Sequence, residues 1–264
     1  MIHPFISGNK WRKLKYILLE AKKLQKKHLV TFGGAHSNHL LATSCAAAKF
    51  GFSSTGIVRG ENVENETLLL CRLFGMQLIF ADRESYRDKP ALFKVQFDND
   101  PEAFFIDEGG SGPLAATGCS ELLDELTEAY DHLFCAAGTG TTAAGILSGI
   151  NRKSLATKMH IVPVLKGADF LKQEINKLSN GASYEFHSEY HFGGYAKTSD
   201  ELLNFIKDFT SSTGILIDPV YTGKLFFAIY DLISKDYFAR GSRILAVHTG
   251  GITGILGMAD RFKF

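Results

Sequence analysis

The sequence predicts an α/β fold in which open parallel sheets are covered by helices on both faces. Short apolar runs typical of strands alternate with longer amphipathic runs typical of helices along the chain, and this order favours parallel sheets. Polar, glycine-bearing segments follow several of the predicted strands, which is where open parallel sheets bind ligands. The 264 residues are 45% apolar and 22% charged, enough for a sizeable core in one large or two small domains.

The first half of the chain alternates helix and strand. Apolar residues at helical spacing, separated by lysine and glutamate, predict the first helix. Ser37 or Asn38 is placed to cap the second helix, and Gly51 to end it. The predicted helices are 11–24, 38–50 and 65–74, and the predicted strands are 29–32, 55–58, 77–81 and 103–106.

The second half continues the alternation after a glycine-rich loop at 109–113. An apolar strand at 132–136 leads into a glycine turn and a helix rich in small residues. The chain shows no internal repeat, low-complexity tract or obvious linker. The predicted helices are 114–130, 143–150, 170–178, 200–210 and 224–238, and the further strands are 159–164, 215–217 and 244–247.

Charge, hydropathy and cysteine spacing argue against several classes of function. A net charge of +1 gives no electrostatic reason to expect nucleic acid or an anionic membrane as a partner. No apolar run approaches the roughly 20 residues of a membrane helix, and the first residues lack the basic segment and apolar core of a signal peptide. The four cysteines lie in apolar patterns without metal spacing, so we expect buried reduced thiols, no metal site and a cytoplasmic location.

The most informative stretch is the turn Gly138-Thr139-Gly140-Thr141-Thr142, between a predicted strand and a predicted helix. Strand, glycine turn and helix present backbone N–H groups to a phosphate, and the threonine hydroxyls add donors. The turn lacks both the lysine of a nucleotide-triphosphate loop and the glycine spacing of a dinucleotide fingerprint. The pattern indicates a small phosphate cup, and a plain glycine turn is the alternative.

Other polar segments are unusual choices for structure alone. Taken singly, each is better explained as a cap, a turn or a solvated helix start. Lys10, however, opens a helix, where the positive end of the helix lowers the pKa of a lysine and favours Schiff-base chemistry. The other segments follow predicted strands, as the glycine turn does, and this shared position predicts one binding site. The segments are 7–13 (SGNKWRK), 33–39 (GGAHSNH), 218–224 (DPVYTGK) and 247–251 (VHTGG).

Together, the motifs GNKWRKLKY, GGAHSNH, GTGTT, DPVYTGK and HTGG resemble the family of 1-aminocyclopropane-1-carboxylate (ACC) deaminases and D-cysteine desulfhydrases. These are pyridoxal-phosphate (PLP) enzymes of the tryptophan-synthase-β fold, and the resemblance covers nearly the whole chain in the family's order. It implies two α/β domains with the cofactor in the cleft. Residues 14–114 would form the smaller domain, and 1–13 plus 115–264 the larger, PLP-binding domain.

The resemblance also implies roles for individual residues. Lys10 matches the lysine that binds PLP covalently, Asn38 the asparagine at the cofactor's phenolic oxygen, and Ser37 a serine near the substrate carboxylate. Tyr195 and Tyr221 match the two active-site tyrosines. The remaining cofactor residues are those of the phosphate cup, Gly138, Thr139, Gly140, Thr141 and Thr142, with Thr222 at the pyridine nitrogen and Thr249 in the loop beside it.

Thr222 and Thr249 bear on the reaction. ACC deaminases carry a glutamate and a leucine at these positions, so the threonine pair is desulfhydrase-like. A hydroxyl stabilises a protonated pyridine ring less than a carboxylate does, which makes the ring a weaker electron sink. That suffices for α,β-elimination from a small amino acid to give a 2-oxo acid and ammonia, with Lys10 as the base. ACC deamination is the alternative within the family.

The chain also departs from the family pattern. Family members normally have another strand and a charged segment before the lysine motif, whereas only nine residues precede Lys10. We therefore expect a truncated or shortened member with altered stability and activity. Leu40-Leu41-Ala42 lacks a basic residue often found there, so carboxylate binding is expected to differ. A catalytically silent PLP protein and a protein binding a sugar phosphate or nucleotide remain alternatives. The expected partners are a small amino-acid substrate and a second copy of the chain, as a homodimer.

Overall fold

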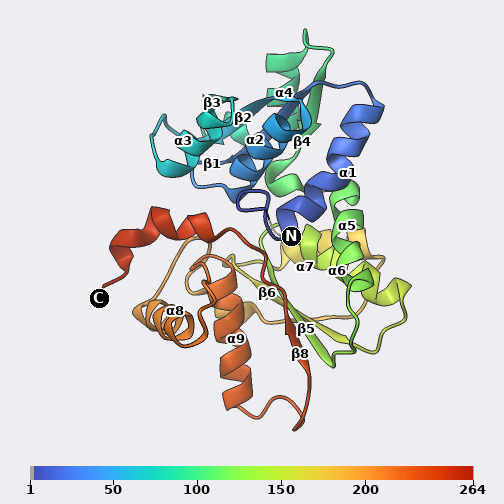
Figure 1. The fold of residues 1–264 in the computed structure, drawn as a ribbon, viewed down its shortest axis with the longest axis vertical. Coiled ribbons are helices and arrows are strands. Elements are labelled where there is room, and N and C mark those ends of the chain that lie inside the picture. The colour runs from blue at the N-terminus through green and yellow to red at the C-terminus, as the bar shows by residue number, and fades with distance from the viewer. Residues whose placement is uncertain (1–2, 264) are drawn as a thin grey trace. The chain divides into compact units, whose positions relative to one another are not determined.

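The computed structural model describes residues 3–263 and divides into two compact units, Met1–Ala115 and Ala116–Phe264. Each unit contains a four-stranded parallel sheet with helices (Figure 1). The predicted α/β class with parallel sheets is therefore confirmed. Within the described residues, no helix is both long and apolar enough to cross a membrane.

The first unit contains a sheet in the order β3-β2-β1-β4. Side chains alternate between the two faces of a strand, and β1 shows the consequence. Leu29 packs with α1 and α2 on one face, whereas Val30 and Phe32 pack on the other face, towards α4. The strands are β1 (His28–Gly34), β2 (Ser53–Arg59), β3 (Met76–Ala81) and β4 (Ala103–Ile106), and the helices are α1 (Asn9–Lys23), α2 (Asn38–Phe50), α3 (Glu66–Leu73), α4 (Lys89–Phe97), η1 (Ser85–Arg87) and η2 (Glu108–Gly110).

The second unit contains a sheet in the order β7-β6-β5-β8. Leu133 and Cys135 of β5 pack with α6 and α7, whereas Phe134 and Ala136 pack with α9 on the opposite face. The strands are β5 (His132–Ala137), β6 (Lys158–Pro163), β7 (Glu185–Phe186) and β8 (Ile244–Ala246). The helices are α6 (Thr141–Arg152), α7 (Phe170–Ser179), α8 (Asp200–Thr213), α9 (Thr222–Ser234), η3 (Glu121–Asp124), η4 (Ser188–His191) and η5 (Ile252–Arg261), and α5 (Pro113–Ser120) spans the boundary between the units.

Two predicted elements are wrong. Residues 215–217 form no strand: Ile215 and Leu216 are exposed, and only Ile217 is buried, in a cluster with α8. The helix predicted to reach residue 130 ends at Ser120, and only the short 3₁₀ turn η3 follows it. The prediction also missed α4, which has no buried residue to create a helical pattern, and β7, which is only two residues long.

The compact units and the predicted domains differ at the N-terminus. The first unit includes the residues before α1, because Ile6 packs in one core with Leu14 and Ile17 of that helix. The predicted assignment of residues 1–13 to the larger domain remains a prediction, and residues 1 and 2 lie outside the described part of the chain.

Candidate cofactor site

The glycine turn lies between β5 and α6, as predicted. Gly140 is the N-cap of α6, with φ 77° and ψ −22°, and no side chain caps this helix. A Cβ atom on Gly140 would lie 2.9 Å from Cγ1 of Ile175, so both conformation and space favour glycine. Thr141 and Thr142 are buried, and the hydroxyls of Thr139 and Thr141 lie 3.4 Å apart. A helix N-terminus without a side-chain cap, beside threonine hydroxyls, has the donors that a phosphate requires.

Two tyrosines lie beside this turn in the same unit. A Cβ atom on Gly138 would lie 3.0 Å from the Oη and Cε1 atoms of Tyr221, so the tyrosine ring covers the glycine closely. The ring of Tyr195 meets that of Tyr221 edge to face, with centroids 6.1 Å apart and an interplanar angle of 76°. Tyr195 is 47% exposed. The structure therefore brings the glycine turn and both predicted active-site tyrosines together.

The segment before α9 is organised by Asp218, a buried carboxylate that sequence reasoning left without a role. Its Oδ2 accepts from the backbone N–H groups of Val220 and Tyr221, and its Oδ1 from the N–H of Thr222. The Thr222 hydroxyl donates to Oδ1 at 2.7 Å and accepts from the N–H of Asp218 at 2.7 Å. A hydroxyl has one proton and two lone pairs, so Thr222 retains a single lone pair for any further partner.

Lys224 is the second residue that the sequence reasoning missed. It is fully buried, and its Nζ donates to the carbonyl oxygens of Gly194 at 2.7 Å, His191 at 2.8 Å and Val164 at 3.4 Å. Burial lowers the pKa of Lys224 to about 8, and the nearby charge of Asp218 opposes this shift. Two of these hydrogen bonds hold the segment 191–194, directly before Tyr195. A lysine at the start of the otherwise apolar run KLFFAI was the available signal.

The lysine motif begins α1 in the first unit. Gly8 is the N-cap, Lys10 lies in the first turn, and that turn contains no acidic residue. Lys13, one turn on, is buried and donates from Nζ to the carbonyl of Gly109 at 2.8 Å. Burial lowers the pKa of His39 well below its usual value, and the positive charges of Lys10 and Lys13 add to the effect. Lys10 therefore lies within electrostatic reach of the residue that follows Asn38.

The segment GGAHSNH connects β1 to α2 in the same unit. Ser37 is the N-cap of α2, and its Oγ accepts from the N–H groups of His39 and Leu40 at 3.3 Å. The predicted capping role of Ser37 is therefore confirmed, and Asn38 is the first residue of the helix. A Cβ atom on Gly33 would lie 2.6 Å from this Oγ, so the turn requires glycine there.

The predicted site residues thus fall into two sets. The first unit holds Lys10, Ser37 and Asn38. The second unit holds the glycine turn 138–142 with the residues of three further segments, which are Tyr195, Tyr221, Thr222 and Thr249. Thr249 is buried in the loop after β8.

Comparison with known proteins defines the class first. The family described as "Pyridoxal-phosphate dependent enzyme" matches residues 2–250, and the chain belongs to this family. It is a PLP-dependent enzyme, as the resemblance implied.

Within that family, the chain belongs with the ACC deaminases and D-cysteine desulfhydrases. A putative ACC deaminase from Thermotoga maritima is 32% identical over 97% of this chain and 87% of the relative. A bifunctional mitochondrial D-cysteine desulfhydrase/ACC deaminase from Arabidopsis thaliana is 30% identical over 97% of this chain and 71% of the relative. The crystal structure of an ACC deaminase homologue has a TM-score of 0.89 at 27% identity, over 97% of this chain and 84% of that structure.

The residues of the second unit fit the phosphate end of this cofactor. The turn has glycine, and therefore no side chain, at positions 138 and 140, and α6 presents its N-terminus without a side-chain cap. Both features are those expected of a backbone cradle for a dianion.

Proposed function

We propose that this protein catalyses a PLP-dependent α,β-elimination on a small amino acid whose β-substituent leaves readily, with D-cysteine as the model substrate. The products are a 2-oxo acid, ammonia and the leaving group. The observation that carries this proposal is the hydrogen-bonded state of Thr222, at the position where ACC deaminases carry an acid.

Thr222 offers the pyridine nitrogen only a weak acceptor. The proton of the Thr222 hydroxyl is already donated to the carboxylate of Asp218. Asp218 stands one hydrogen bond further away, but its carboxylate already accepts from three backbone N–H groups as well as from this hydroxyl. These four donors already occupy the carboxylate, which has no direct contact to offer at the position of Thr222. The pair therefore supports ring protonation less than a directly placed glutamate would, and this favours elimination over opening of a cyclopropane ring.

We propose that residues of both units bind the cofactor and the substrate. Gly138–Thr142 bind the phosphate, Asn38 orients the cofactor at its phenolic oxygen, and Lys10 binds it covalently. When bound, PLP supplies the electron sink that stabilises negative charge on the substrate's α carbon. Once the substrate amine has released Lys10, its Nζ takes up the α proton. Ser37 binds the substrate carboxylate.

Tyr221 is proposed to exchange protons on the substrate side, with Tyr195 beside it. The edge-to-face contact between the two rings and the close cover of Gly138 by Tyr221 support this role. For D-cysteine, the Cα–H and Cβ–S bonds break, sulfide leaves with a proton as hydrogen sulfide, and the released enamine adds water to give pyruvate and ammonia. One water is consumed for each substrate.

ACC deamination is the second candidate, because several relatives are named for it. The deciding experiment compares kcat/KM for D-cysteine and ACC on the purified holoenzyme, using a keto-acid assay over matched D- and L-amino acids. We expect D-cysteine, or an amino acid with a comparable leaving group, to be the better substrate. A clear preference for ACC would reject the argument from Thr222. Turnover of none of these substrates, with PLP bound, would identify a catalytically silent protein.

We also propose a cytoplasmic homodimer. The four buried cysteine thiols suit a reducing compartment, although one relative is named as mitochondrial. Light scattering coupled to size-exclusion chromatography tests the dimer, and fractionation of the source cell tests the location.

A further inference from the structure

A cluster of metal-binding side chains lies in the second unit, on β6 and β7. His160 lies on β6, and Glu185 begins β7 directly beside it in the parallel register. His187 lies directly after the two residues of β7, and its backbone N–H donates to the carbonyl of Ile161 at 2.9 Å. One ligand atom from each of the three side chains lies within 4.8 Å of the others.

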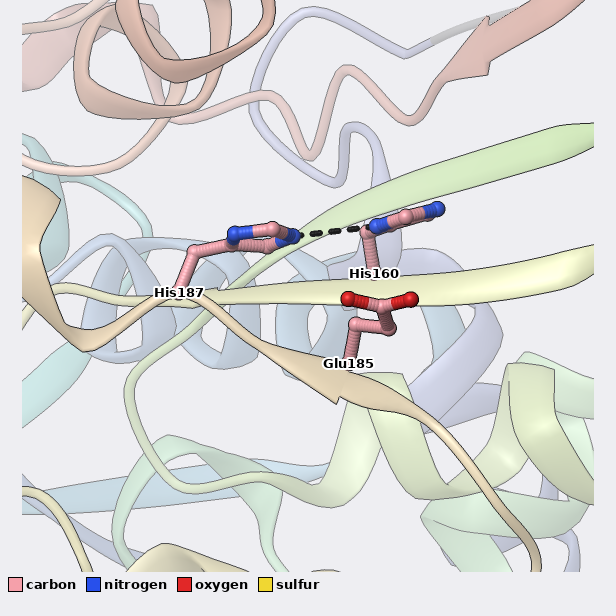
Figure 2. Close-up of side chains that lie close together, drawn as sticks. All are labelled: His160, Glu185 and His187. Atoms are coloured by element: carbon pink, nitrogen blue, oxygen red, sulfur yellow. Dashed lines mark hydrogen bonds between the residues drawn. The ribbon is translucent and has the colours of Figure 1, made fainter. Parts of the chain in front are cut away.

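The two histidine rings face each other edge to edge. Nδ1 of His160 and Nε2 of His187 are 3.0 Å apart, and Figure 2 shows the carboxylate of Glu185 beside the two rings. Two nitrogens bound to one zinc ion at about 2.0–2.1 Å in tetrahedral geometry are about 3.4 Å apart. To share a cation, the two nitrogens would need to move apart by a few tenths of an ångström, and the rings, now inclined by 17°, would need to turn so that both lone pairs point at the ion.

Two of the three side chains also have a hydrogen-bonded outer partner of the kind that metal ligands use, and the third has a carboxylate nearby. Nε2 of His160 lies 2.8 Å from Nδ1 of His132, and Nδ1 of His187 lies 3.8 Å from a carboxylate oxygen of Glu189. The hydroxyl of Tyr237 donates to Glu185 at 2.7 Å. Outer partners of this type fix the tautomer of a ligating histidine and the orientation of a ligating carboxylate.

From this geometry we propose that His160, Glu185 and His187 form a binding site for a divalent late first-row metal ion, with zinc as the expected occupant. Two imidazoles and one carboxylate suit zinc, and not magnesium or calcium, which prefer sites made entirely of oxygen. Both rings bind as neutral tautomers: His160 holds its proton on Nε2, towards His132, and His187 holds its proton on Nδ1, towards Glu189. A water molecule completes the coordination, reached from the side of the exposed Glu185.

The protonation states suit this site. Burial lowers the pKa of His160 to about 4, with further lowering by His187 and His132, and burial also lowers the pKa of His187. The hydrogen bond from Tyr237 lowers the pKa of Glu185. Neutral imidazoles and ionised carboxylates are the forms that bind metal.

The site is separate from the phosphate cup within the second unit. His160 of β6 pairs with Phe134 of β5. Phe134 lies three residues before Ala137, the last residue of β5, after which the glycine turn begins. At about 3.3 Å per residue, the two positions are about 10 Å apart along the sheet. A metal here would fasten β7, a two-residue edge strand, to β6, and would therefore act on stability and not on the reaction.

Zinc binding to the holoenzyme, with any affinity tag removed, tests the proposal. The zinc content per chain is measured by mass spectrometry after gel filtration. The zinc affinity is measured by competition with a chromophoric chelator, and magnesium serves as the negative control. The variants are Glu185→Gln, His187→Asn and Tyr237→Phe, and the control is Glu201→Gln, which removes the same charge from an exposed position in α8. The PLP absorbance of each variant reports whether its fold is intact.

We expect one zinc per chain, no competition by magnesium, and wild-type affinity in Glu201→Gln. Glu185→Gln and His187→Asn should each weaken binding by at least tenfold, and Tyr237→Phe by about tenfold, as outer-partner changes do. The proposal is overturned if the wild-type protein retains less than half an equivalent of zinc, or if folded Glu185→Gln binds zinc as tightly as Glu201→Gln does. Because Glu185 is exposed, its variant remains informative even if His187→Asn does not fold.

Discussion

The phosphate role of the glycine turn can be tested by placing a charge at Gly140 while holding backbone and size constant. Gly140→Asp and Gly140→Asn introduce nearly identical side chains, and both residue types tolerate the left-handed conformation that Gly140 adopts. In both variants the new Cβ atom meets Ile175 at 2.9 Å, so the packing cost is shared. The difference between them isolates the effect of one carboxylate beside the phosphate.

The expected difference follows from Coulomb's law. For a carboxylate about 5 Å from one phosphate charge, with an effective dielectric constant of about 20, the repulsion is about 3 kcal/mol. Since about 1.4 kcal/mol corresponds to a tenfold change in affinity, Gly140→Asp should bind PLP at least about 100-fold more weakly than Gly140→Asn.

The assay is a fluorescence or absorbance titration of each PLP-depleted variant with PLP, repeated at high salt. Circular dichroism and urea unfolding establish that both variants are folded and equally stable. Equal PLP affinity in the two folded variants would refute the assignment of residues 138–142 to the phosphate, whatever the loss relative to the wild-type protein.

Three further predictions follow from contacts in the structure. Tyr221→Phe should keep bound PLP and lose about 100-fold or more in kcat, the usual size of a proton-transfer contribution; equal loss of cofactor and activity would indicate a packing role. Lys224→Met removes three hydrogen bonds, two of them to carbonyls of the segment 191–196. It should therefore speed limited proteolysis of that segment and lower the free energy of unfolding by about 2 kcal/mol or more. An unchanged cleavage rate would contradict this prediction. His39 is held neutral in the folded state, so below the ordinary histidine pKa of about 6.5 the unfolded state binds more protons than the folded state. The free energy of unfolding should therefore fall by about 1.4 kcal/mol for each pH unit below that pKa. If the urea midpoint shifts equally between pH 7.5 and pH 5.5 in the wild-type protein and in His39→Gln, His39 is not the cause.

The sequence predicts the fold best where the elements are deeply buried. The strand at 132–136 follows from a short continuous apolar run, and the helix after the glycine turn from its apolar and small residues; the structure contains both, as β5 and α6. The apolar run 215–217 looks the same in the sequence, but only Ile217 is buried, against helices and not within a sheet. Local pattern cannot distinguish these two outcomes, because the partner of the run is distant in the chain.

Long-range partners also explain what was missed at the candidate site. The acceptors of Lys224 are carbonyl oxygens 30 to 60 residues away, so its role is invisible in the motif that contains it. The cluster of His160, Glu185 and His187 depends on the pairing of β6 with β7. Its only local signal is the Glu-x-His spacing of 185–187, at the two-residue strand β7 and the residue that follows it.

The lysine that binds the cofactor covalently can be identified chemically. Reduction of the holoenzyme with borohydride, followed by digestion and peptide mass spectrometry, fixes the cofactor on the lysine that holds it. We expect the pyridoxyl label on the peptide containing Lys10, and loss of the bound chromophore in Lys10→Ala. Lys224 is the rival, since burial lowers its pKa to about 8, but its hydrogen bonds to three carbonyls identify it as structural. A label on Lys224, or on any lysine other than Lys10, would show that Lys10 is not the residue that binds PLP.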